Sequence, residues 1–90
     1  MKAIHKNGKR KTSIAKATMS QGKGTVRINN ILLDNYSPEI GRMKIMEPLI
    51  LAGSQAKEFD INVNVKGGGW SSQSEASRLA IARCLVELNK

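Results

Sequence analysis

Apolar and polar side chains alternate over residues 59–66 more strictly than anywhere else in the chain. Such alternation is typical of a β-strand with one buried face and one exposed face. The exposed side chains of this strand would be Asn62, Asn64 and Lys66. If the earlier strands pair beside it, Lys16 and Arg27 would join them, and the sheet would have one polar face.

Shorter strands are predicted earlier in the chain. Over residues 10–19, small residues and Met19 occupy every second position and would face the core. A second strand is predicted over 25–29, and residues 31–33 are a candidate for a short third strand. Residues 21–24 (Gln-Gly-Lys-Gly) have the composition of a turn and predict that the first two strands form a hairpin.

A first helix is predicted to begin at residues 37–39, where a serine can cap it and a proline can occupy its first turn. Ile40, Met43 and Met46 recur at helical spacing and would face the core. Pro48 is predicted to break this helix, because proline lacks the N–H that the next hydrogen bond requires. A second short turn is then predicted to stop at a glycine, residue 53.

A longer helix is predicted over 72–89. Its apolar positions form two neighbouring stripes, so it should be largely covered; they are Ile81, Cys84, Leu85 and Leu88, and Leu79, Ala82 and Val86. This order of elements predicts one α+β domain of two layers, with helices on one face of a β-sheet and the other face open. Residues 1–9 are polar and basic, and we expect them to form a flexible arm.

The charge of the chain is concentrated at its start. The 90 residues carry 15 Lys and Arg against 7 Asp and Glu, which gives a net charge of +8. Residues 1–27 hold eight of these bases and no acid, whereas residues 28–90 hold seven bases and seven acids. A one-sided basic segment is typical of a protein that binds a polyanion. Nucleic acid fits better than a membrane surface, because the segment lacks a broad apolar face.

Few residues suggest catalysis, a metal or a cofactor, and none of these is expected. His5 is the only histidine and lies in the basic start; Cys84 is the only cysteine and lies on an apolar helix stripe, so no internal disulfide is possible. No apolar run approaches the roughly 20 residues of a membrane span, and no signal-peptide core is present. We therefore expect a cytosolic protein.

Three consecutive glycines, Gly67, Gly68 and Gly69, separate the alternating strand from the last helix. Such a loop at a helix start is a candidate phosphate-binding site, because the first N–H groups and the helix dipole favour an anion. The loop also resembles that of kinases of the galactokinase–homoserine kinase class, which need a larger substrate region. An ordinary tight strand-to-helix turn is the alternative explanation. Trp70 follows and would either stack on a base or pack over the helix start.

Several motifs in a fixed order resemble universal small-subunit ribosomal protein nine, in its archaeal form. Together they cover almost the whole chain and lie at residues 8–17, 24–29, 44–49, 51–53 and 60–69, followed by Gln73, Arg78 and residues 80–83. The resemblance implies a ribosomal protein of the small-subunit head that binds ribosomal RNA. It also implies the fold of the second domain of ribosomal protein five, with a left-handed βαβ crossover, and no catalysis.

The same resemblance implies an RNA site made of the basic first strand, the glycine loop and the start of the last helix. The residues carried over are Lys9, Arg10, Lys11, Thr12, Lys66, Gly67, Gly68, Gly69, Gln73 and Arg78. Position and charge add Lys6, Lys16, Arg27, Trp70 and Ser72. The partners implied are the 3′ major domain of the small-subunit RNA and neighbouring head proteins, at the ribosome.

Two departures from the family pattern stand out. Residues 72–74 are Ser-Gln-Ser where the family usually has Gly-Gln-Ala. Family members also continue into a long basic tail that reaches transfer RNA, whereas this chain ends at Lys90, so contact with transfer RNA is not expected from these 90 residues. A nucleotide-binding enzyme that uses residues 67–72 and an RNA-binding module outside the ribosome are the alternative functions.

Overall fold

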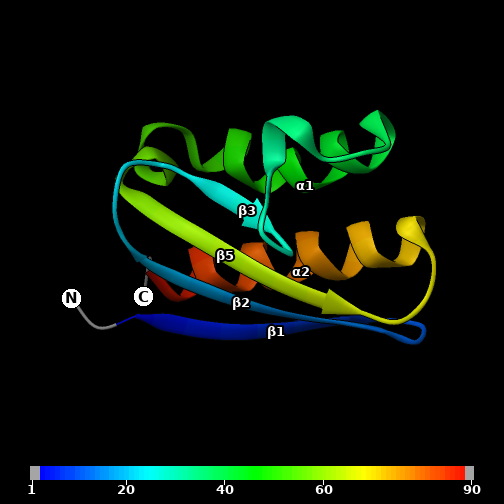
Figure 1. Cartoon of the computed structure of the whole chain (residues 1–90). Helices are drawn as coiled ribbons and strands as arrows, with labels where there is room; N and C mark the ends of the chain where they lie inside the picture. Colours follow the sequence, from blue (N-terminus) through cyan, green and yellow to red (C-terminus); the bar gives the residue numbers. More distant parts are fainter. Residues whose placement is uncertain (1–2, 89–90) are drawn as a thin grey trace.

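A computed structural model describes residues 3–88 of the chain. It contains a five-stranded mixed sheet with the strand order β1-β2-β5-β3-β4 and two α-helices packed against it (Figure 1). The strands are β1 (Ile4–Arg10), β2 (Ser13–Gln21), β3 (Val26–Ile28), β4 (Ile31–Leu32) and β5 (Phe59–Lys66); the helices are α1 (Glu39–Ala52) and α2 (Trp70–Leu88), with 3₁₀ turns η1 (Leu33–Asn35) and η2 (Gly53–Glu58). The predicted α+β class is confirmed.

Strand β5 occupies the centre of the sheet. Its apolar side chains are buried and its polar ones are mostly exposed, which confirms the strand predicted over 59–66. It pairs antiparallel with β2 and parallel with β3. The predicted hairpin between β2 and β3 is therefore wrong, because β5 lies between them. As a long strand, β5 pairs with β2 along one edge and with β3 along the other. The parallel β3–β5 pair is joined through β4 and α1, so the chain contains a βαβ crossover.

The flexible arm predicted over residues 1–9 is wrong for residues 4–9. These residues belong to β1, an edge strand that pairs antiparallel with β2 along its whole length. Residues 1 and 2 lie outside the described part. Gly8 is buried here because β1 runs directly against α2: a Cβ on it would overlap the carbonyl oxygen of Ala76 and lie 2.7 Å from the backbone nitrogen of Ala80. Polar outward positions and an inward glycine hid this strand in the sequence.

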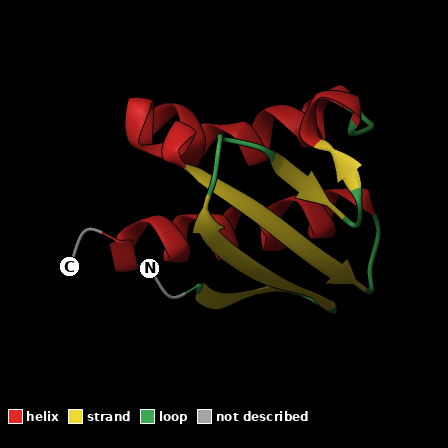
Figure 2. Cartoon of the chain, turned by 60° about the vertical axis from the view of Figure 1, so that its left-hand side comes forward, coloured by secondary structure: helices red, strands yellow, loops and turns green. Residues whose placement is uncertain are grey.

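Both helices lie on the same side of the sheet (Figures 1 and 2). Helix α2 packs across β1, β2 and β5, and α1 packs along α2. The core between the layers is formed by buried apolar side chains from both, including Met19, Ile28, Ile45, Ile61, Val63, Ile81 and Cys84. The side chains that point away from this core form an uncovered face of the sheet.

Helix α1 differs from its prediction in its continuity and in its N-terminal cap. It is continuous from Glu39 to Ala52 with Pro48 inside it, so the predicted break is wrong. Pro48 lacks the N–H for one helical hydrogen bond, but its ring is buried on the covered side of the helix. The predicted serine cap is also absent, since the N-cap is Pro38 and no side chain bonds there. Gly53 ends the helix as predicted, with φ +63°.

The predicted inward face of α1 is wrong at Ile40 and Met43, whereas Met46 packs against the core as predicted. Ile40 and Met43 are each 61% exposed, and the buried positions are Gly41, Ile45 and Pro48. Gly41 determines this orientation, because a Cβ there would lie 2.5 Å from Ser74 Oγ of α2. The face of α1 with the smallest residue, rather than the face with the largest apolar ones, thus makes the closest approach.

Helix α2 begins two residues earlier than predicted. Its covered side carries small residues under the sheet, Ala76, Ser77 and Ala80, followed by Ile81, Cys84 and Leu85. The second predicted stripe is wrong at Val86, which is 64% exposed. Cys84 is fully buried, as predicted for a small core residue, and this burial raises the pKa of its thiol.

Candidate nucleic-acid interface

The uncovered face of the sheet gathers polar and basic side chains into rows that cross the strands. Paired residues of neighbouring strands point to the same side, so the pairing of Asn7 with Lys16 and of Lys16 with Asn64 makes one row. We call this surface the basic face; its members are His5, Asn7, Lys9, Ile14, Lys16, Thr18, Arg27, Asn62, Asn64 and Lys66.

The register confirms that Lys16 and Arg27 join the polar side of β5. Lys16 lies opposite Asn64 in β2, and Arg27 lies opposite Asn62 in β3. The five strands contain one acidic residue, Asp60, and it is already engaged. Its Oδ1 accepts from the backbone N–H groups of Lys23 at 3.0 Å and Thr25 at 2.9 Å. The basic face therefore presents cations and amides with little acidic charge among them.

The β1–β2 turn and the glycine loop lie side by side at one end of the sheet. The buried hydroxyl of Ser13 donates to the Gly67 carbonyl at 2.7 Å, and Gln73 Nε2 donates to the same oxygen at 3.1 Å. Predicted site residues that are far apart in the sequence are thereby brought together, namely Lys9, Arg10, Lys11, Thr12, Lys66, Gly67, Gly68, Gly69 and Gln73.

The glycine loop is shaped mainly by the chain's own backbone. Gly67 and Gly68 have φ of +82° and +65°, which side chains rarely adopt. A Cβ on Gly67 would overlap the carbonyl oxygen of Thr12, and one on Gly68 would overlap Ser13 Oγ. Only Gly69 has open space, with no heavy atom within 4 Å of its Cβ position. Gly69 is thus the loop position that another molecule can approach.

Helix α2 starts immediately beside this loop. The backbone N–H of Gln73 donates to the Gly69 carbonyl at 3.0 Å, so the free N–H groups of the first turn belong to the residues just after the loop. Trp70 is 46% exposed at this start, and Ser72 lies next to Gly68. Ser74 is buried and its hydroxyl donates to the Trp70 carbonyl at 2.8 Å, so this departure from the family pattern is absorbed inside the helix.

Two predicted site residues lie elsewhere. Lys6 points to the helix side of β1 and pairs with Glu87 at 3.4 Å. Arg78 bonds Glu75 at 3.1 Å and pairs with Glu47 of α1 at 3.6 Å. The Arg78 guanidinium, followed by Lys44, holds the pKa of Glu75 below its usual value. Both cations thus bind acidic side chains of the helices and lie off the basic face.

The sequence did not indicate a role in the site for Ile14 or for Asn29. Ile14 is 45% exposed on the basic face, and the alternation of its strand already indicated this outward direction. The side chain of Asn29 pairs with the backbone of Val65, donating to its carbonyl at 3.1 Å and accepting from its N–H at 2.8 Å. Only the structure places Asn29 beside β5, where its amide continues the pairing of β3.

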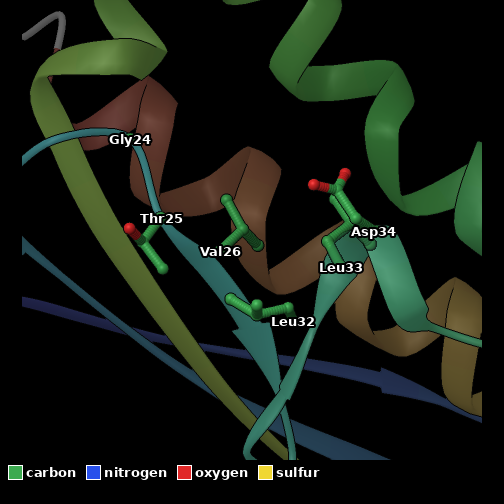
Figure 3. Close-up of a pocket in the computed structure, with 6 residues that line it drawn as sticks. All are labelled: Gly24, Thr25, Val26, Leu32, Leu33 and Asp34. Carbon is green, nitrogen blue, oxygen red and sulfur yellow. The ribbon is translucent and has the colours of Figure 1, made fainter.

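A small hollow of about 240 Å³ lies between the start of β3 and the β4–η1 segment (Figure 3). Val26, Leu32 and Leu33 supply its apolar lining, and among the described residues the Asp34 carboxylate is the only charged group that lines it. A carboxylate repels phosphate, so this hollow does not extend the basic face. Within residues 3–88 no three His, Cys, Asp or Glu side chains are grouped to hold a metal ion. In the same part of the chain, neither helix is long and apolar enough to span a membrane.

The family model described as ribosomal protein S9/S16 matches residues 8–90. The chain belongs to this family. Small ribosomal subunit protein uS9 of Desulfurococcus amylolyticus is 54% identical over 87 residues, which cover 97% of this chain and 62% of that protein. The proteins of the same name from Methanothrix thermoacetophila and Methanococcus maripaludis are each 46% identical over 87 residues, covering 66% and 65% of their own lengths.

These archaeal relatives confirm the resemblance read from the sequence. The chain spans about two thirds of the length of the curated relatives that it matches. The match to the S9/S16 family contains both the β1–β2 turn and the glycine loop. Of the site residues predicted from the sequence, only Lys6 precedes the matched span.

Proposed function

We propose that this chain is a structural protein of the small ribosomal subunit and that it binds ribosomal RNA through the basic face. Its relatives are named as small ribosomal subunit proteins, which supports the ribosomal role. The observation that carries the RNA contact is the alignment of Lys16, Arg27 and Lys66 with asparagines on an uncovered sheet face. Such rows of cations and amides suit phosphates and riboses.

The partners that we propose are the RNA of the subunit head, within the 3′ major domain, and neighbouring head proteins. The site would extend from the basic face to the β1–β2 turn and to the start of α2, where Trp70, Ser72 and Gln73 lie. The role is structural rather than catalytic, in keeping with the family. The single domain formed by the sheet and its two helices is the RNA-binding unit.

The geometry of the glycine loop favours this function over nucleotide binding. A nucleotide-binding loop leaves room for phosphates along its glycines. Here the backbone of Thr12 and the side chain of Ser13 occupy the space beside Gly67 and Gly68. An extended RNA backbone can approach the remaining open position, Gly69, from the side of the sheet.

The salt dependence of RNA binding tests the proposal. The RNA is a transcript of the 3′ major domain of an archaeal small-subunit RNA. Lys16→Gln/Lys66→Gln removes two cations from the basic face, and the matched control Arg42→Gln/Lys57→Gln removes two from the helical layer. For two lost phosphate contacts, the slope of log K against log salt should fall by about 1.4–1.8 in magnitude.

The control should keep the slope of the unmodified protein, because its two cations do not lie on the basic face. It is a matched control, since both variants change the net charge equally. Equal weakening by the two double variants would mean that only total charge matters and would overturn the assignment of the basic face. RNA binding that is insensitive to salt would overturn the proposed function itself.

A further inference from the structure

A hollow of about 580 Å³ lies on the basic face. Its lining places it over the β2–β5 pair towards the glycine-loop end of the sheet: Ile14 and Lys16 at the start of β2, Asn64, Val65 and Lys66 at the end of β5, and Asn29. Pockets that bind small organic groups typically have volumes of about 300–1,000 Å³. The hollow is therefore large enough for one nucleotide.

The floor of the hollow is built from two adjacent cross-strand pairs. Ile14 lies opposite Lys66, and Lys16 lies opposite Asn64. These pairs place one exposed apolar side chain between two ammonium groups, with an amide at the next position. One wall is fixed, because both polar groups of the Asn29 side chain bond the backbone of Val65.

The polar groups of the floor have no partner within residues 3–88. Neither Lys16 nor Lys66 forms an ion pair with these residues, and no hydrogen bond occupies the Asn64 amide. Two free cations can bind consecutive phosphates, and a free amide can both donate to and accept from the edge of a base. The chemistry thus matches one nucleotide with its flanking phosphates.

Ile14 gives the hollow an exposed apolar surface, which a surface that binds only phosphates would not need. It is 45% exposed, and an apolar side chain among lysines leaves its surface in water unless a flat apolar group covers it. Sequence-specific recognition of RNA mainly uses unstacked bases, whose faces stack on side chains and whose edges form hydrogen bonds. Trp70, the aromatic residue predicted as a candidate for stacking, does not line this hollow.

We propose that this hollow, the base pocket, holds one unstacked nucleobase of the bound RNA. The face of the base packs on Ile14, its edge bonds the amide of Asn64, and Lys16 and Lys66 bind the phosphates on either side. This inference rests on the proposed function, and it adds a defined subsite for an unpaired nucleotide to a surface that otherwise contacts only the RNA backbone.

The test compares Ile14→Ser with Ile31→Ser. Ile31 is 49% exposed on β4 and does not line the base pocket, so it is a control of equal chemistry and similar exposure. Ile14→Ser should weaken binding to the 3′ major domain transcript by about three- to tenfold, since roughly half of a full isoleucine burial is lost. Its salt slope should stay unchanged because no cation is removed. Ile31→Ser should bind as the unmodified protein does.

An abasic scan locates the partner base. The probe is the smallest synthetic fragment of the transcript that retains full affinity, with each unpaired nucleotide in turn replaced by an abasic one. One position should cost the unmodified protein about three- to tenfold and should cost Ile14→Ser clearly less, because only the Asn64 contact to the base remains. If Ile14→Ser fails to fold, Asn64→Ala should show a smaller loss at the same position than the unmodified protein, because only the Ile14 contact to the base remains.

The outcomes separate this inference from the proposed function. Full affinity in Ile14→Ser together with weakened binding by Lys16→Gln/Lys66→Gln would overturn the base pocket and leave the basic face intact. Full affinity in both would overturn both. Displacement of the RNA fragment by micromolar adenosine monophosphate would also overturn the base pocket, because the hollow would then be a site for free nucleotides.

Discussion

Gly67→Ala tests whether the glycine loop is shaped by the chain itself. Gly67 has φ +82°, and an added Cβ would overlap the carbonyl oxygen of Thr12 in the β1–β2 turn. Neither problem can be relieved by rotating a side chain, because both involve backbone. The substitution should therefore destabilise the folded state even when no RNA is present.

The expected magnitude follows from these two effects. A non-glycine residue held at an unfavourable φ costs about 1–3 kcal/mol. Overpacking against fixed atoms costs about 1–3 kcal/mol more. The total is at least about 2 kcal/mol, and each kcal/mol shifts the Tm of a domain of this size by about 4–8 °C. The Tm of Gly67→Ala should therefore be at least about 8 °C lower.

Gly69→Ala is the matched control in the same loop. Its Cβ position has no heavy atom within 4 Å, and its φ lies outside the glycine-favouring region. Its free energy of unfolding should stay within about 0.5 kcal/mol of the unmodified value. Thermal unfolding followed by circular dichroism measures both variants. If RNA approaches the loop at Gly69, this variant should keep its Tm and lose affinity.

Equal Tm values for Gly67→Ala and the unmodified protein would refute the packing of the loop against Thr12. Equal losses for Gly67→Ala and Gly69→Ala would refute the distinction between a closed and an open loop position. In either case, the glycines would have to be explained by the approach of a ligand rather than by the fold.

Three further variants test other contacts. Gly8→Ala should lower the free energy of unfolding in urea by about 1–3 kcal/mol, because its Cβ would overlap α2; an unchanged value would mean that β1 and α2 are farther apart. On β1, Lys9→Gln should reduce the salt slope of RNA binding by about 0.7–0.9, whereas Lys6→Gln, on the opposite side of the strand, should not; equal effects would contradict this strand's orientation. Hydrogen bonds from the N–H groups of Thr25 and Lys23 lower the pKa of Asp60 below 3.8, so its ionisation stabilises the fold above that pH and this stability is lost as the pH falls through the folded-state pKa. Asp60→Asn should be less stable than the unmodified protein in urea at pH 7, and the two should converge below pH 3.8; a gap that is independent of pH would contradict this role of the charge.

The elements predicted best were those with one buried and one exposed face. In β2 and β5 the period of two appears directly in the sequence, because water covers one side of each strand. The neighbours of a strand leave no such signal. The turn between β2 and β3 therefore suggested a hairpin, although the competing partner, β5, comes much later in the chain.

Close packing on glycines is a second reason why predictions from the sequence were wrong, for β1 and for α1. The inner position of β1 is Gly8 and that of α1 is Gly41, and each lies where another backbone or helix comes closest. Apolar periodicity gives weight to large side chains, so it turned α1 towards Ile40 and Met43, which are exposed. A glycine selected for close approach has no side chain to reveal the face on which it lies.

The candidate site was predicted in part. Charge alone identified the basic first third, and alternation put Lys16 and Arg27 on the polar side. The meeting of Thr12 with Gly67 and the base pocket over Ile14 depend on the β2–β5 register. That register joins segments distant in the sequence, and no local pattern encodes it.

The central position of β5 also constrains how the protein folds during its own synthesis. The β1–β2 hairpin is made first and can pair locally, but its apolar side has no cover until α2 is made. Strand β3 must wait for β5, its main partner, so neither half of the sheet is complete before residue 66. Such non-local pairing folds slowly and leaves strand edges exposed for longer. The basic face is therefore complete only after β5 has joined the two halves of the sheet.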